Sequence, residues 1–169
     1  VLTKYKGIPN STGGSYSAHD ILTIASIVEL EGNNSDNRSK IAKVIYNRLA
    51  ANMSLGSDVT TYYAIRVDMG ERDLYAKEIN TYNAYNTRGP NMEGKLPVGP
   101  IASVSEESIK AALNPTGEKS LYFVADKNGD IYFSDTYEEH QETIATLKKK
   151  GLWYEYNTTA TDNSSNTSN

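Results

Sequence analysis

Two glutamates close an apolar stretch of the sequence and are the residues best suited to chemistry. Glu29 and Glu31 end a segment over residues 21–31 that is otherwise mostly apolar. A carboxyl held against apolar surroundings has a raised pKa, because desolvation disfavours its anion. A glutamic acid that stays protonated near neutral pH can protonate the leaving group when a glycosidic bond is cleaved. The pair therefore indicates general acid chemistry as one interpretation.

The helix that carries these glutamates fixes their directions. Residues 17–20 (SAHD) form an S-x-x-D capping box, which predicts the start of the helix. At about 100° per residue, Glu29 and Glu31 fall on opposite flanks of the apolar stripe, and Leu30 falls on the solvated face. Spacing alone favours the plainer interpretation, in which both glutamates are boundary residues paired with Lys or Arg.

The remaining pattern predicts an α+β fold in a single domain. Apolar periodicity predicts helices over residues 36–52, 103–113 and 137–150, with Asp36 as the cap of the first, and short helical turns over 60–69 and 73–78. Two β-rich runs, over 121–125 and 131–134, predict a hairpin. Residues 80–100 form a long loop rich in Asn, Gly and Pro, and loops of this length are usually functional or disordered. We expect residues 1–16 to be a linker or lead-in segment, residues 17–156 to be the domain, and residues 157–169 to be a disordered polar tail.

Composition excludes several classes of protein. The chain has no cysteine and only two histidines, His19 and His140, so we expect no metal and no cofactor. We expect His140 to be a solvent-facing or capping residue. The net charge is −4, and the basic run at 148–150 sits at a predicted helix end, so we expect no nucleic-acid partner. The 13 tyrosines suit either sugar rings or half-buried packing.

Six motifs in the same order resemble one family. Residues 25–31 (ASIVELE) resemble the A-S-I-V-E-x-E signature of the YceG-like endolytic murein transglycosylases. The others are similar to the N-R-L, D-P-T-x-x-Y, Y-N-T, L-P-P-G-P-I and Y-F-V-A segments of that family, and they occur at residues 47–49, 58–63, 85–87, 96–101 and 122–125. The resemblance covers about residues 20–152. It implies a helical lysozyme-like catalytic part followed by the hairpin and a final helix.

The resemblance also implies roles for individual residues. Glu31 matches the catalytic acid of the family, and Glu29 matches a supporting residue. Further polar and aromatic side chains would bind substrate or support the site, and these are Asn47, Arg48, Ser57, Asp58, Thr60, Tyr63, Tyr85, Asn86 and Thr87. The implied reaction cleaves the β-1,4 bond between N-acetylmuramic acid and N-acetylglucosamine within peptidoglycan strands and leaves a 1,6-anhydro product.

The resemblance places this chemistry on the extracytoplasmic face of the bacterial membrane. It implies a single-pass anchor that lies outside the sequence given, and cell-wall synthases as candidate partners. We expect the loop over 80–100 to form one wall of the glycan groove beside the end of the first helix. In that wall, the exposed side chain of Asn86 would hold an acetamido group or Glu31, and Tyr85 would stack on a sugar or brace the wall.

The chain departs from the family pattern at several positions. Gly56 stands where the family commonly has Gln, and Ile131 stands where it usually has His. Other motif positions are also changed, at Val59, Asn83, Ala84, Arg88 and Val98.

Two alternatives to the lytic reaction stay open. One is a hydrolytic muramidase that uses Asp58 or Glu29 as a second carboxylate. Glu29 and Glu31 leave one helix roughly 160° apart, which makes them a poor pair. The other alternative is a glycan-binding module without catalysis.

Overall fold

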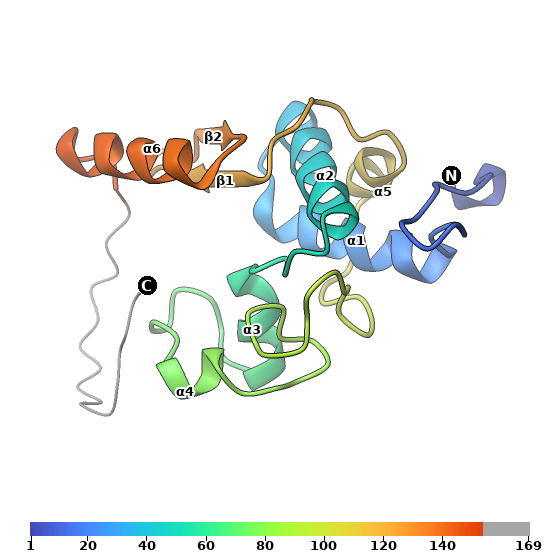
Figure 1. The fold of residues 1–169 in the computed structure, drawn as a ribbon, viewed down its shortest axis with the longest axis horizontal. Helices are drawn as coiled ribbons and strands as arrows, with labels where there is room; N and C mark the ends of the chain where they lie inside the picture. The colour runs from blue at the N-terminus through green and yellow to red at the C-terminus, as the bar shows by residue number, and fades with distance from the viewer. Residues whose placement is uncertain (154–169) are drawn as a thin grey trace.

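The structure is a computed structural model that describes residues 1–153, so the polar tail predicted over 157–169 lies outside the described residues. The hairpin with its final helix extends to one side of the helical body (Figure 1). In chain order the elements are η1 (Leu2–Lys4), α1 (Ala18–Glu31), α2 (Ser35–Ala50), α3 (Asp58–Ile65), α4 (Ala76–Ile79), α5 (Glu106–Leu113), β1 (Tyr122–Ala125), β2 (Ile131–Ser134) and α6 (Tyr137–Lys149). The predicted α+β arrangement is confirmed.

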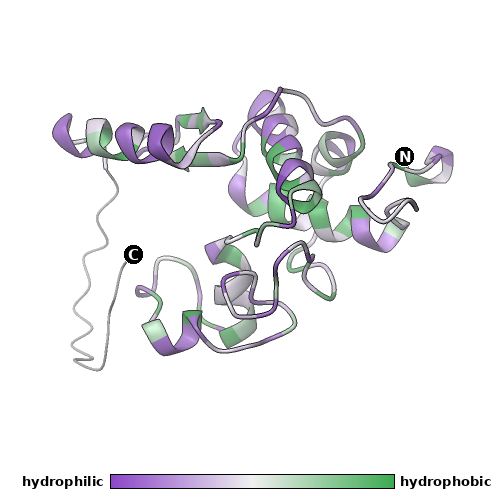
Figure 2. Ribbon diagram, in the orientation of Figure 1, coloured by the Kyte–Doolittle hydropathy of each residue, from purple (hydrophilic) through white to green (hydrophobic). Residues whose placement is uncertain are grey.

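Helix α1 is the centre of the core, and α2 and α5 pack against it. Its middle turns are buried almost all round, because the polar Thr23 and Ser26 also lie inside. Thr23 donates its hydroxyl to His19 O at 2.9 Å, and Ser26 donates to Thr23 O at 2.7 Å, so their burial leaves no hydroxyl unsatisfied. Figure 2 shows apolar residues on the faces that α1 and α2 turn towards each other. This packing fixes the end of α1, where Glu31 lies.

The helix caps follow the sequence at α1 and differ from our prediction at α2. Ser17 and Asp20 form the predicted capping box. The cap of α2 is Asn34, whose side chain accepts a hydrogen bond from Asn37 N at 2.9 Å. The prediction of Asp36 as the cap was wrong. Asp36 lies within the first turn and instead pairs with Lys40 at 2.9 Å.

The first 16 residues pack on the helical body. Tyr5 donates its hydroxyl to Tyr16 O at 2.5 Å and accepts a hydrogen bond from Ile8 N at 2.7 Å. Leu2, Tyr5, Ile8 and Tyr16 are partly buried against the core. The segment that we predicted as a linker or lead-in is therefore held by side-chain contacts.

The hairpin and α6 form a small layer beside α2 (Figure 1). Strands β1 and β2 are antiparallel, with Phe123 opposite Phe133. Helix α6 is largely hydrophilic and buries only Leu147. His140 on α6 stacks on Tyr122 with ring centroids 5.1 Å apart and is half-buried, so its predicted solvent-facing position was wrong. Within residues 1–153, none of the helices has the length and hydropathy needed to cross a membrane.

Candidate active site

Glu31 ends α1 and is held by a residue of another helix. The hydroxyl of Ser57, which directly precedes α3, donates a hydrogen bond to Glu31 Oε1 at 2.8 Å. Burial raises the pKa of Glu31 from its ordinary 4.5 to about 7; the Ser57 hydrogen bond acts against this rise, and the negative charge of Asp58 adds to it. Glu31 can therefore carry a proton near neutral pH and lose it in the same range.

Two buried threonines position Ser57. The Ser57 N–H donates to Thr87 Oγ1 at 3.0 Å, and Thr60 Oγ1 donates to Ser57 O at 2.7 Å. The two threonine hydroxyls also lie 2.7 Å apart, within hydrogen-bond distance. Ser57 makes no side-chain cap to α3, so its hydroxyl stays directed at Glu31. Three predicted site residues from two distant segments thus form one hydrogen-bonded cluster, and Ser57 joins that cluster to the Glu31 carboxyl.

Asp58 lies next in sequence but has a different partner. Its Oδ1 is 2.5 Å from Arg88 Nη1, and the Asp58 side chain is more than half exposed. Arg88 occupies a position where the chain departs from the family pattern. Sequence reasoning did not include Arg88 among the site residues, because an arginine in a loop carries no local signal of its partner.

Glu29 is separated from Glu31 and held by α5. Its Oε2 accepts hydrogen bonds from the hydroxyls of Ser105, at 2.7 Å, and Ser108, and from Ser105 N at 3.3 Å. The Ser108 and Ser105 hydrogen bonds hold the pKa of Glu29 below its ordinary value despite partial burial. In the described part of the chain neither glutamate forms a salt bridge, so the interpretation as residues paired with Lys or Arg was wrong.

Asn47 and Arg48 attach the hairpin to the helical body. Asn47 Nδ2 donates to Glu118 O and Ser120 O, both at 3.0 Å. Arg48 donates to Leu121 O at 2.5 Å and to Ser54 O at 2.9 Å. Asn47 Nδ2 and the Nε and Nη1 of Arg48 thus donate to backbone carbonyls, which is a structural role and not contact with a ligand.

Gly56, one departure from the family pattern, lies beside Arg48. The guanidinium of Arg48 lies over the Tyr122 ring, 4.9 Å from the centroid. Gly56 has a φ of +59°, and a Cβ built there would lie 3.5 Å from Arg48 Nη1. Glycine therefore suits this position, because a left-handed backbone is strained for most side chains.

Asn86 is buried, contrary to our expectation of an exposed loop amide. Only 1% of its surface is exposed. Its Oδ1 accepts a hydrogen bond from Thr61 Oγ1 at 2.7 Å, and its Nδ2 lies within hydrogen-bond distance of the carbonyls of Glu78, Ile79 and Thr81. All of its polar atoms are used inside the protein, so these contacts support a role in holding the loop and not in holding an acetamido group.

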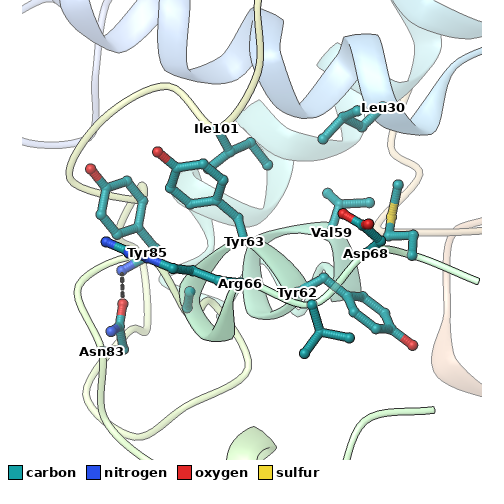
Figure 3. A pocket seen from close by; sticks show the side chains of 12 residues that line it. Leu30, Val59, Tyr62, Tyr63, Arg66, Asp68, Asn83, Tyr85 and Ile101 are labelled. Atoms are coloured by element: carbon teal, nitrogen blue, oxygen red, sulfur yellow. Dashed lines mark hydrogen bonds between the residues drawn. The ribbon is translucent and has the colours of Figure 1, made fainter. Parts of the chain in front are cut away.

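A pocket of about 700 Å³ opens between α3 and the loop over 80–100 (Figure 3). Tyr63 and Tyr85 form part of its wall, with ring centroids 4.9 Å apart in an edge-to-face arrangement. Leu30, which is 38% exposed, also lines it, and this explains an apolar residue on the solvated face of α1. The other lining residues include Val59, Tyr62, Arg66, Asp68, Met69, Asn83 and Ile101. Leu30 and Val59 directly neighbour Glu31 and Asp58 in the chain, so the pocket lies beside the acid, although Glu31 itself is not one of its lining residues.

The end of the loop over 80–100, and Ile101 directly after it, contact α1. His19 Nε2 lies 2.9 Å from Val98 O, and the Ile101 N–H donates to Ser26 Oγ at 3.0 Å. Among residues 1–153, no group of three or more His, Asp or Glu side chains is arranged to hold a metal ion. The site thus consists of the Glu31 carboxyl, which can be protonated near neutral pH, beside a pocket whose wall includes Tyr63 and Tyr85.

Comparison with known proteins identifies the family. A model of the YceG-like family matches residues 3–146. The chain belongs to the YceG-like family. It is 41% identical over 128 residues to an endolytic murein transglycosylase of Bacillus subtilis, and 34% identical over 137 residues to one of Streptococcus pneumoniae. A crystal structure of a putative YceG-like protein from Listeria monocytogenes superposes with a TM-score of 0.68 at 40% identity, over 75% of this chain and 40% of that chain.

The matches cover most of this chain and a smaller part of the relatives. They include 75% of the chain against the Bacillus protein and 76% against the Streptococcus protein. The same matches span 34% and 24% of the lengths of those relatives. The chain therefore corresponds to one portion of longer family members, and that portion contains Glu31.

Proposed function

We propose that this domain is a peptidoglycan lytic transglycosylase that cleaves the β-1,4 bond between N-acetylmuramic acid and N-acetylglucosamine within glycan strands. The observation that carries the proposal is the Glu31 carboxyl, with a pKa of about 7, beside the pocket. The names of the relatives support the same activity. Because peptidoglycan lies outside the cell membrane, the proposed place of action is the extracytoplasmic face. A membrane anchor and cell-wall synthase partners stay predictions.

Glu31 performs two proton transfers in the proposed reaction. In its protonated form it donates to the glycosidic oxygen as the bond to C1 of muramic acid breaks. The resulting carboxylate then accepts the proton of the C6 hydroxyl of the same sugar, and that oxygen bonds to C1. The products are a 1,6-anhydro-muramic acid end and a free hydroxyl on the leaving sugar, and no water is consumed. Ser57 stabilises the carboxylate between the two steps, because its hydroxyl donates to Oε1.

The surroundings of the other carboxylates favour this reaction over hydrolysis. A hydrolytic muramidase requires a second carboxylate that acts on water or on the sugar. Glu29 is directed to Ser105, the N-cap of α5, and to Ser108 within that helix, and Asp58 is bound by Arg88. In the intramolecular reaction Glu31 alone suffices, since the nucleophile belongs to the substrate.

Analysis of the reaction products tests the proposal. Purified peptidoglycan digested with this domain should yield strands that end in anhydro-muramic acid, about 18 Da lighter than hydrolytic products in mass spectra. Glu31→Gln keeps the shape of the side chain and should lower turnover by about 10²–10⁴-fold. Glu142→Gln, an exposed change on α6, is the matched control and should leave turnover unchanged. Reducing ends alone would assign a muramidase, whereas binding of strands without turnover would assign a glycan-binding module.

A further inference from the structure

Arg66 brings a charged group to the pocket beside Glu31. It follows α3 as the C-cap residue and is exposed, and it lines the pocket. Within residues 1–153 its guanidinium makes no hydrogen bond and no salt bridge, although its five N–H groups are strong donors. The arginines at 38, 72 and 88 each pair with a carboxylate. Arg66 therefore differs from these three in having its charge available to a ligand.

The backbone at Arg66 is in a conformation that arginine does not favour. Its φ is +58° and its ψ is +41°, in the left-handed region. Glycine adopts this conformation without steric cost, and for that reason the left-handed residue at the end of a helix is usually a glycine. Non-glycine residues held in such conformations are found preferentially at ligand sites. Within residues 1–153 no hydrogen bond or salt bridge of the side chain offsets the strain at Arg66, so internal polar contacts give no reason for an arginine here.

The direction of the Arg66 side chain separates it from the nearest acid of the pocket. Figure 3 shows Arg66 extending along the pocket wall towards Tyr85 and Asn83, while Asp68 lies at the opposite end near Val59 and Leu30. No salt bridge joins Arg66 and Asp68. One end of the pocket therefore combines a cation with tyrosine rings, and the other end lies next to the catalytic helix.

We propose that Arg66, with Tyr63 and Tyr85, forms a subsite that selects a sugar carrying a carboxylate. This inference rests on the proposed function, and it adds the chemical feature of the strand that the pocket recognises. Tyr63 is 44% exposed, so its ring offers a surface on which a sugar can stack. The guanidinium of Arg66 binds the carboxylate in a bidentate manner.

Two parts of a peptidoglycan strand can supply this carboxylate. One is the lactyl group of muramic acid in strands without peptide, where its carboxylate is free. The other is a carboxylate of the stem peptide in strands that carry peptide, where the lactyl group is amidated. Both sources present the same chemistry to Arg66, and a binding experiment with three ligands distinguishes them.

Calorimetry on the Glu31→Gln background measures binding without turnover. The ligands are neutral β-1,4 oligomers of N-acetylglucosamine, peptide-free glycan strands and peptide-bearing strands. Arg66→Ala should weaken binding of at least one carboxylate-bearing ligand by about tenfold or more, the loss of one charge-assisted pair. Binding of the neutral oligomers should change by less than about twofold. Arg66→Lys should recover part of the affinity, since it keeps the charge but not the planar fork.

Matched variants separate binding from folding and from general charge. Arg66→Gly relieves the left-handed strain, so it should raise the melting temperature and still lose affinity as Arg66→Ala does. Asn91→Gly also places a glycine at a left-handed position, with φ +63°, but that residue does not line the pocket. This variant should keep the affinity of the parent protein. Lys149→Ala removes an exposed charge from α6 and should also keep affinity.

The outcomes distinguish the subsite from the proposed function. A loss confined to peptide-free strands assigns the lactyl carboxylate, and a loss confined to peptide-bearing strands assigns the stem peptide. Equal losses on all three ligands, or no loss on any, overturn the subsite while the product analysis still stands. Hydrolytic products together with a selective loss for Arg66→Ala would overturn the lytic reaction and leave the subsite in place. If none of the three ligands binds the Glu31→Gln protein, the subsite proposal fails, and the product analysis decides the proposed function separately.

Discussion

The Ser57 hydroxyl donates a hydrogen bond to Glu31 across 2.8 Å and so joins the start of α3 to the end of α1. Thr60 and Thr87 hold the backbone of Ser57 from the other side. The acid is therefore fixed in direction by a chain of hydroxyl groups and not by an ion pair. Burial raises its pKa, while the Ser57 hydrogen bond limits the rise.

Removing this hydroxyl should change the pH profile of the reaction. Because the Ser57 hydrogen bond lowers the pKa of Glu31, Ser57→Ala should raise that pKa and move the alkaline limb of the activity profile to higher pH. Turnover at the optimum should fall by about tenfold, since the carboxyl loses its fixed direction. Ser57→Thr keeps a hydroxyl and should restore much of the activity. A tenfold loss with an unchanged pH limb would show that Ser57 acts only through folding.

Glu31 should also make stability depend on pH. The folded protein binds a proton at Glu31 up to a pKa of about 7, whereas the unfolded chain releases it near 4.5. The folded state therefore loses stability as pH rises through this window, by about 1–3 kcal/mol. Glu31→Gln has no proton to lose, so it should be more stable than the parent protein at pH 8 and similar at pH 4. Chemical denaturation at both pH values measures the difference, and an equal difference at both would contradict the raised pKa.

Glu29 should show the opposite dependence. Hydrogen bonds from Ser108 and Ser105 lower its pKa, so its contribution to stability is present above the unfolded pKa and is lost as pH falls through the folded one. Glu29→Gln should destabilise the protein by about 1–2 kcal/mol at pH 7, because the hydroxyls lose a charged acceptor. Ser108→Ala should cost a similar amount, and the double variant should cost less than the two added together. Full additivity in denaturation experiments would show that the two side chains act independently.

Much of the fold could be predicted because its signals are local. The S-x-x-D box at residues 17–20, the Asp, Asn and Gly turn of the hairpin and the apolar stripe of α1 each depend on residues close together in the chain. Glu31 was chosen by the resemblance of residues 25–31 to the family signature, and its catalytic role stays a prediction. The burial of Asn86 could not be predicted, because its partners are backbone carbonyls fixed only when the loop over 80–100 folds. The roles of Arg48 and Arg88 were hidden for the same reason.

Asn86 should matter for stability more than our sequence analysis suggested. An exposed loop amide can be removed with little effect, but this amide is buried and accepts from Thr61 while donating to backbone carbonyls. Asn86→Ala leaves those groups unpaired and should lower the free energy of unfolding by about 2–4 kcal/mol. Turnover should fall as well, because Thr87, the next residue, accepts the hydrogen bond that holds Ser57 in front of Glu31.

Asn83→Ala, in the same loop, is the matched control and should cost less than about 1.5 kcal/mol, since its side chain caps only one exposed backbone N–H. Denaturation midpoints of the two variants give the comparison. Equal midpoints for them would show that Asn86 does not hold the loop against α3.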